Sequence, residues 1–169
     1  MKNQDNFLYI KKPNGRYAIA EPDRVVESAQ EIVASHYNRS GDTVISNPTV
    51  AREQLYLRMN REHEVFVVMF LDSKHRILGV DEMFRGTIDN ASVPVREIVK
   101  DALKYNAAAL VVAHNHPSGV AEPSQADKSL TETIYLATSM VGIKLIDHFV
   151  FGDGGYEAGF SFAETGTLQ

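Results

Sequence analysis

Three apolar runs, each interrupted by few polar residues, constrain the fold of this chain most strongly. They span residues 64–72 (EVFVVMFLD), 107–114 (AAALVVAH) and 143–152 (IKLIDHFVFG). A strand with one face in water alternates apolar and polar residues, whereas a near-continuous apolar run indicates a strand covered on both faces. Helices are predicted between these runs, at 94–106 and 124–142. The alternation predicts an α/β (α+β) fold, in which a sheet packs between helices.

Other segments add to this sheet. Residues 76–84 (RILGVDEMF) follow a polar turn and are predicted to form a strand that pairs with 64–72. Asn47 and Pro48 predict the start of a helix, because asparagine favours the N-cap and proline the first turn. The segment 86–91 is predicted to be a loop.

The beginning of the chain is predicted to form an extension of the main domain. Residues 7–20 indicate two short strands around a Pro-Asn-Gly turn. Residues 23–38 have the apolar spacing of a helix, and 38–42 (NRSGD) are the best candidate for a linker. We therefore predict an N-terminal hairpin and helix extension over residues 1–46 and one main domain over residues 47–169.

Composition excludes several classes of protein. The chain has no cysteine, which excludes disulfides, thiolate nucleophiles and cysteine-ligated zinc sites, including those of the zinc nucleobase deaminases. The net charge of −5 gives no general electrostatic reason to bind nucleic acid. No apolar run approaches the roughly 20 residues of a membrane helix, and the first residues lack an apolar secretory segment. We expect a soluble, cytoplasmic protein without membrane association.

The segment 111–127 (VVAHNHPSGVAEPSQAD) carries a candidate metal site. His114 and His116 are two residues apart, so in an extended chain their rings point to the same side. Pro117 favours that extended backbone at His116. Asp127 falls in the first turn of the following helix and could return to the histidines. Two histidines and one aspartate, with water in the fourth position, form a catalytic zinc arrangement, although iron, cobalt or manganese could use the same ligands.

Hydrolysis at such a metal needs a base that takes a proton from the water and returns it to the leaving amine. Glu62, Glu64 and Glu82 are the candidates for this base. Glu64 is favoured because it begins the strongest apolar strand, so the core fixes its backbone while its side chain reaches a cleft. Ser124 is a candidate donor to the developing oxyanion.

Each of these features also has a purely structural interpretation. A single His-x-His pair is more often structural than metal-binding. Ser124 and Asp127 match a capping box at a helix start, and a carboxylate there is also favoured by the helix dipole. Glu64 could be an exposed charge at a strand edge. His148, which follows Asp147 inside an apolar run, could equally orient a ligand imidazole or be a core histidine.

Taken together, Glu64, His114, His116, Ser124 and Asp127 have the spacing Glu…His-x-His-Pro-x6-Ser-x2-Asp. This spacing resembles the JAMM motif of the JAB/MPN metalloprotease superfamily. The stretch FRGTIDNASVPVREIVKDALKYNAAALVVAHNHPSGVAEPSQAD, with IKLIDHFVFG and SFAETG, is similar to the RadC branch. The resemblance covers roughly residues 47–169.

The resemblance implies an MPN (JAB) fold, with a mixed sheet between helices. It implies that His114, His116 and Asp127 bind zinc, that Glu64 is the general base, and that Ser124 stabilises the tetrahedral intermediate. Family members outside the RadC branch hydrolyse peptide or isopeptide bonds, so a peptide or protein substrate of unknown identity is expected.

Two departures bear on function. Asn115 separates the histidines where deubiquitinating members carry serine or threonine, which is compatible with metal binding but is a warning about the substrate. No helix-hairpin-helix region is expected, so the chain resembles the shorter RadC-like proteins associated with mobile elements. Three functions remain open: a zinc-dependent amide hydrolase, a non-catalytic MPN scaffold, and a nucleic-acid-associated role for which the acidic composition gives little support.

Overall fold

The computed structural model describes residues 8–25, 28, 44–59, 62–86 and 93–168. The chain divides into two compact units, Met1–His36 and Tyr37–Gln169. The predicted linker 38–42, most of the predicted helix 23–38 and most of the predicted loop 86–91 lie outside the described residues. The predicted domain boundary between residues 46 and 47 stays a prediction.

The first unit contains the predicted hairpin. Strands β1 (Tyr9–Lys11) and β2 (Tyr17–Ile19) pair in antiparallel orientation. The turn between them uses Gly15 at φ +79°, a backbone conformation that costs glycine little. The Pro-Asn-Gly signal therefore identified the turn correctly.

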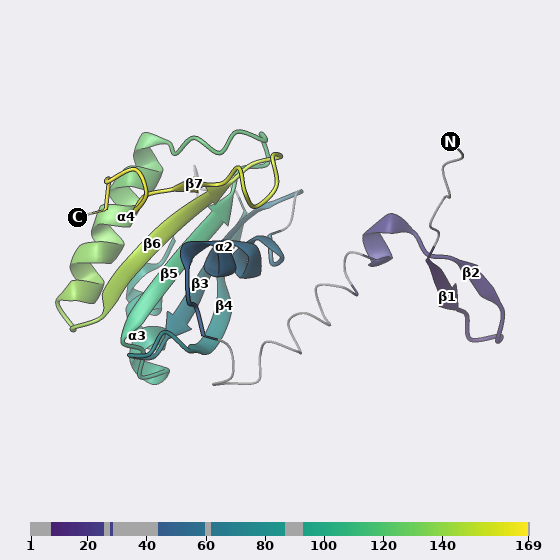
Figure 1. Ribbon diagram of the computed structural model, residues 1–169, viewed down its shortest axis with the longest axis horizontal. Coiled ribbons are helices and arrows are strands. Elements are labelled where there is room, and N and C mark those ends of the chain that lie inside the picture. The colour runs from purple at the N-terminus through teal and green to yellow at the C-terminus, as the bar shows by residue number, and fades with distance from the viewer. Residues whose placement is uncertain (1–7, 26–27, 29–43, 60–61, 87–92, 169) are drawn as a thin grey trace. The chain divides into compact units, whose positions relative to one another are not determined.

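The second unit is built on a five-stranded sheet (Figure 1). In spatial order the strands are β4 (Ile77–Gly86), β3 (Glu64–Leu71), β5 (Ala109–Asn115), β6 (Lys144–Phe151) and β7 (Phe160–Ser161). Only the β5–β6 pair is parallel, and the other three pairs are antiparallel. The sheet is mixed, as expected for an MPN (JAB) fold.

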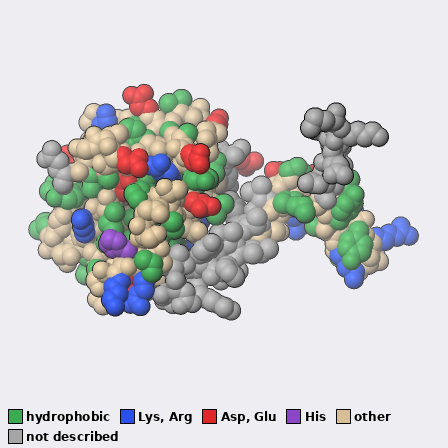
Figure 2. All heavy atoms as spheres, in the orientation of Figure 1, with side chains coloured by type: hydrophobic (Ala, Val, Ile, Leu, Met, Phe, Trp, Pro, Cys, Tyr) green, Lys and Arg blue, Asp and Glu red, His purple; other side chains and the backbone are tan. Residues whose placement is uncertain are grey.

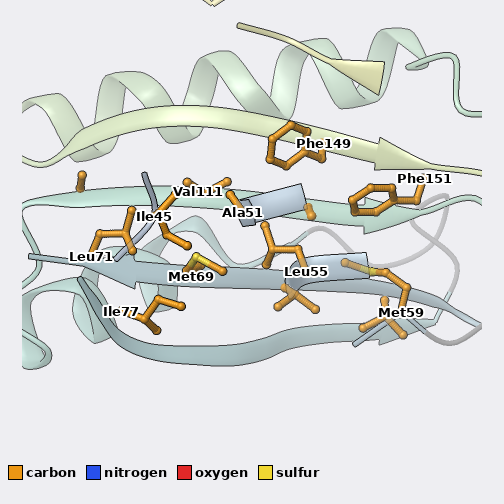
Figure 3. Packing of buried hydrophobic residues seen from close by; sticks show 14 residues of the cluster. Ile45, Ala51, Leu55, Met59, Met69, Leu71, Ile77, Val111, Phe149 and Phe151 are labelled. Carbon is orange, nitrogen blue, oxygen red and sulfur yellow. The ribbon is translucent and has the colours of Figure 1, made fainter. Parts of the chain in front are cut away.

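Helices cover both faces of this sheet, which confirms the fold class. Helix α2 (Pro48–Tyr56) packs on one face, while α3 (Val95–Lys104) and α4 (Gln125–Ser139) pack on the other. Strand β3 contributes alternate residues to the two cores, since successive side chains point to opposite faces. Figure 3 shows the α2 side, where Leu55 lies close to Met69 of β3. This two-sided burial is why the strand sequences are continuously apolar.

Local signals set the helix ends. Asn47 caps α2 by accepting a hydrogen bond from the Val50 backbone amide at 3.0 Å. Asn106 adopts φ +52° just after α3, the left-handed conformation that ends a helix. None of the helices in the described parts of the chain is both long and apolar enough to cross a membrane.

Strand β7 was not predicted, and a buried carboxylate holds it. Asp147 of β6 accepts hydrogen bonds from the Ser161 hydroxyl at 2.6 Å and from the Ala163 amide at 3.0 Å. It also accepts one from the His148 amide at 2.7 Å. Burial raises the pKa of Asp147, while these donors favour its charged form. Three hydrogen bonds therefore compensate a carboxylate inside an apolar strand.

Candidate metal centre

The candidate site lies at the end of the sheet where the inner strand β3 begins and its neighbour β5 ends. These strands are antiparallel, with Phe66 opposite His114. The first residue of β3, Glu64, therefore comes close to the last residues of β5. Strand β5 then continues into the loop 116–123, which leads to the first turn of α4. Three segments that are distant in sequence thus supply side chains to one place.

The start of α4 fixes Asp127 through a capping box. The Ser124 hydroxyl accepts a hydrogen bond from the Asp127 amide at 3.1 Å. In return, Asp127 Oδ2 accepts from the Ser124 amide at 2.7 Å and from its hydroxyl at 2.6 Å. The predicted structural role of this pair is therefore real, and it holds the buried carboxylate in one orientation.

The same carboxylate faces both histidines. Asp127 Oδ1 lies 3.2 Å from His114 Nε2, and Asp127 Oδ2 lies 3.4 Å from His116 Nε2. The two Nε2 atoms are 3.0 Å apart. Glu64, His114 and His116 each offer one ligand atom, and these atoms lie within 4.8 Å of one another. The structure thus brings together the three proposed ligands and Glu64, the favoured candidate for the base.

Electrostatics at the centre favour an anionic Asp127. Burial raises the pKa of this carboxyl, but its contacts with His114, His116 and Ser124 more than offset burial and hold the pKa well below its usual range. The hydrogen bond to Asp127 raises the pKa of His116, against the lowering effect of burial. In the metal-free protein, positive charge is thus favoured beside this carboxylate.

His148 contacts His114, the more deeply buried histidine of the centre. Its Nε2 lies 2.8 Å from His114 Nδ1, and its Nδ1 lies 2.6 Å from the Thr131 hydroxyl. Its ring is fully buried and stacks on Phe162 at a centroid distance of 5.0 Å. Burial lowers the pKa of His148 well below its ordinary value. The ring of His148 thus contacts His114 and Thr131 directly, and a role in orienting His114 stays a hypothesis.

His116 is held differently. Its Nδ1 lies 2.8 Å from the carbonyl oxygen of Val120, in the loop that follows β5. Its amide donates to the Phe151 carbonyl at 2.8 Å, which ties the loop to the end of β6. The His114 side chain is fully buried, whereas 18% of the His116 side chain is accessible. The centre is therefore reached from the His116 side.

The family comparison agrees with this geometry. Residues 45–167 match the family described as a RadC-like JAB domain. The chain belongs to this family. A UPF0758 protein of Methylibium petroleiphilum is 46% identical over 150 residues, which cover 88% of this chain and 65% of that protein. A UPF0758 protein of Vibrio cholerae is 44% identical over 162 residues, covering 92% of this chain and 98% of that protein. Against the Methylibium protein, the chain spans about two thirds of the relative's length.

The predicted resemblance to RadC-like proteins is thereby confirmed. The JAB family supports a metal-dependent hydrolase in general terms, and the structure contains a His/His/Glu cluster that could hold a metal ion. The names of these relatives state no reaction. The reaction of this RadC-like JAB domain is therefore argued from its site.

Among the candidate bases, only Glu64 belongs to the cluster described above. Glu82 lies on the outer strand β4 and forms an exposed ion pair with Arg85, at 2.8 Å between Oε1 and Nε. Glu62 is exposed and precedes β3. The hydroxyl of Ser124 is engaged with Asp127 Oδ2, so its role toward an oxyanion stays a prediction.

Asn115, the residue between the histidines, makes a contact that the sequence did not reveal. Its Oδ1 accepts from the Val65 amide at 2.9 Å, and its Nδ2 donates to the His63 carbonyl at 2.9 Å. These two bonds flank Glu64 on both sides. Asn115 thus attaches the backbone that carries Glu64 to the end of β5, between His114 and His116.

Proposed function

We propose that this RadC-like JAB domain is a zinc-dependent hydrolase that cleaves a peptide or isopeptide bond, with His114, His116 and Asp127 as the metal ligands. The supporting observation is the spacing of the donor atoms. The two histidine Nε2 atoms lie 3.0 Å apart, and the Asp127 carboxylate faces both of them, with Oδ1 at 3.2 Å from His114 Nε2 and Oδ2 at 3.4 Å from His116 Nε2. Around a tetrahedral zinc with bonds of about 2.0–2.1 Å, neighbouring ligand atoms are about 3.3–3.4 Å apart. Two imidazoles and a carboxylate suit zinc, and iron, cobalt or manganese accept the same donors.

Glu64 is proposed as the general base. A bound zinc would supply Lewis-acid chemistry and lower the pKa of a bound water molecule to about 7. The Glu64 carboxylate, within 4.8 Å of the histidine nitrogens, would take a proton from that water and return it to the leaving amine. Ser124 is proposed to donate to the oxyanion, which requires its hydroxyl proton to turn away from Asp127.

The proposed substrate is a peptide or protein of unknown identity. The partly accessible His116 side chain gives a substrate a route to the centre from that side. Cleavage of an amide bond needs both a proton acceptor and a later proton donor, and Glu64 can act as both. These features support an amide hydrolase.

The other two predicted functions receive less support. A non-catalytic scaffold does not require two histidine rings that face each other at 3.0 Å beside a buried carboxylate. A nucleic-acid role is disfavoured by the net charge of −5, and Figure 2 shows acidic as well as basic side chains on the visible face of the larger unit.

The test combines metal analysis with profiling of cleavage in a proteome-derived peptide library by mass spectrometry. Wild type and Glu64→Gln should each hold about one zinc per chain, because the variant keeps the three proposed ligands. Glu64→Gln should cleave at least about 100-fold more slowly, because the proton acceptor is lost. Equal cleavage by the two zinc-loaded proteins would refute Glu64 as the base. Absence of zinc from wild type would refute the centre itself.

A further inference from the structure

A chain of buried side chains runs from helix α4 to the first histidine of the centre. The Thr131 hydroxyl lies 2.6 Å from the main-chain carbonyl oxygen of Asp127 and 2.6 Å from His148 Nδ1. His148 Nε2 lies 2.8 Å from His114 Nδ1. All four residues are at least nineteen-twentieths buried, with exposures of 4%, 1%, 0% and 0% for Thr131, Asp127, His148 and His114. No water is needed to link them.

The position of each proton in this series of hydrogen bonds follows from its last atom, the main-chain carbonyl oxygen of Asp127. A carbonyl oxygen cannot donate, so the hydroxyl proton of Thr131 points to the Asp127 carbonyl. The opposite polarity would leave two acceptor oxygens 2.6 Å apart with no proton between them. Thr131 must therefore accept from His148, and the proton of a neutral His148 ring lies on Nδ1.

The same reasoning extends to the ligand. With its proton on Nδ1, His148 presents the lone pair of Nε2 to His114, so His114 donates from its own Nδ1. In the neutral ring that binds a metal, the lone pair of His114 then lies on Nε2, the atom 3.0 Å from His116 Nε2 and 3.2 Å from Asp127 Oδ1. This is the form of the ring that binds a metal at that position.

We propose that Thr131 and His148 are positioning residues that fix His114 in the tautomer whose Nε2 lone pair faces the metal. This inference rests on the proposed function and extends it to two residues outside the motif of ligands and base. Helix α4 supplies Asp127 and, one turn later on the same face, Thr131. One helix therefore sets both the carboxylate ligand and the orientation of an imidazole ligand.

The test compares Thr131→Val, Thr131→Ser and Thr138→Val by zinc affinity, measured in competition with a chromophoric chelator. Thr131→Val keeps the side-chain shape but removes the hydroxyl, so zinc should bind about 10- to 100-fold more weakly. Thr131→Ser restores the hydroxyl and should restore the affinity. Thr138 is the matched control, because it is fully buried on α4 and its hydroxyl donates to the Ile134 carbonyl at 2.9 Å, away from the histidines. Thr138→Val should bind zinc like wild type.

A spectroscopic readout tests the proton positions without metal. Nitrogen NMR of the histidine rings in the metal-free wild type should find the His148 proton on Nδ1, and finding it on Nε2 would overturn the proposal. Unchanged zinc affinity in Thr131→Val, or an equal loss in Thr138→Val, would also overturn it. A wild type that binds no zinc would instead refute the proposed function, while the ring spectrum would still decide the tautomer of His148.

Discussion

The two histidines of the candidate centre are only two residues apart, yet their surroundings differ. We call His114, His148 and Thr131 the inner half of the centre, and His116, Glu64 and the loop 117–123 the outer half. The inner half is fully packed and joined by side-chain contacts of 2.6–2.8 Å. In the outer half, His116 contacts a loop carbonyl at 2.8 Å, and its side chain is partly accessible.

The difference suggests a division of tasks. Buried polar groups must all be paired, so a change in the inner half should affect both metal binding and folding. The outer half is the accessible side of the centre, where His116 is held by the Val120 carbonyl as well as by Asp127, and where the proposed base Glu64 lies. We therefore expect substitutions in the inner half to lower the stability of the protein, and substitutions in the outer half to affect mainly zinc binding or cleavage.

The largest effect is expected from a pair of alanine substitutions. His114→Ala and His116→Ala should both abolish stoichiometric zinc binding, because each removes one of three ligands. Only His114→Ala should also strongly destabilise the metal-free protein, by about 2–4 kcal/mol, because it leaves a cavity and unpaired buried groups on Asp127 and His148. Urea unfolding of the metal-free variants measures this. Equal loss of stability in the two variants would show that the halves do not differ.

Asn115→Ala tests the link between the two halves. Loss of its two hydrogen bonds should cost about 1–3 kcal/mol and should loosen the backbone around Glu64. We expect normal zinc content but slower cleavage. Asn47→Ala is a suitable control, since it also removes a side-chain bond to a backbone amide, at the start of α2, and should cost about 1 kcal/mol without changing cleavage. A fall in zinc content of Asn115→Ala would instead place this residue among those that hold the metal.

The sequence predicted the features that depend on local chemistry. The apolar runs identified three strands because those strands are covered on both faces. Asn47 and Ser124 marked helix starts through caps that involve residues three positions away. The His-x-His spacing predicted two rings on one side because an extended strand repeats every two residues.

Features that depend on strand register could not be predicted. The partners of Asn115 are about 50 positions away, at a place fixed by the β3–β5 pairing. The pairing of β5 with β6 shifts by one residue between Leu110 and Val111, so that Val112 lies opposite His148. This shift places His148 rather than Asp147 on the face that carries His114. No local signal in the sequence specifies that shift.

Ser161→Ala tests whether β7 stabilises the segment of β6 that carries His148, through the carboxylate of Asp147. It removes the hydroxyl that donates to Asp147 at 2.6 Å and should cost about 1–2 kcal/mol. Because burial raises the pKa of Asp147, this group's contribution to stability is present below its ordinary pKa of 3.8 and is lost as pH rises through the folded-state pKa. Loss of a donor should raise that pKa further. The difference in free energy of unfolding between variant and wild type, measured by urea unfolding, should therefore increase as pH rises from about 4. A difference in free energy of unfolding that decreases with rising pH would contradict this account.

The smallest effect is expected from Glu82→Gln. Glu82 and Glu64 lie on neighbouring strands, but Glu82 pairs with Arg85 at the surface, and exposed ion pairs contribute little to stability. Zinc content, cleavage and the urea midpoint should all match wild type, whereas Glu64→Gln should lose cleavage alone. The comparison is informative because both changes remove one carboxylate charge from the same sheet, so a difference must come from position. If Glu82→Gln were the variant that lost cleavage, the base would belong to the outer strand, and the position of Glu64 beside the histidines would have no catalytic role.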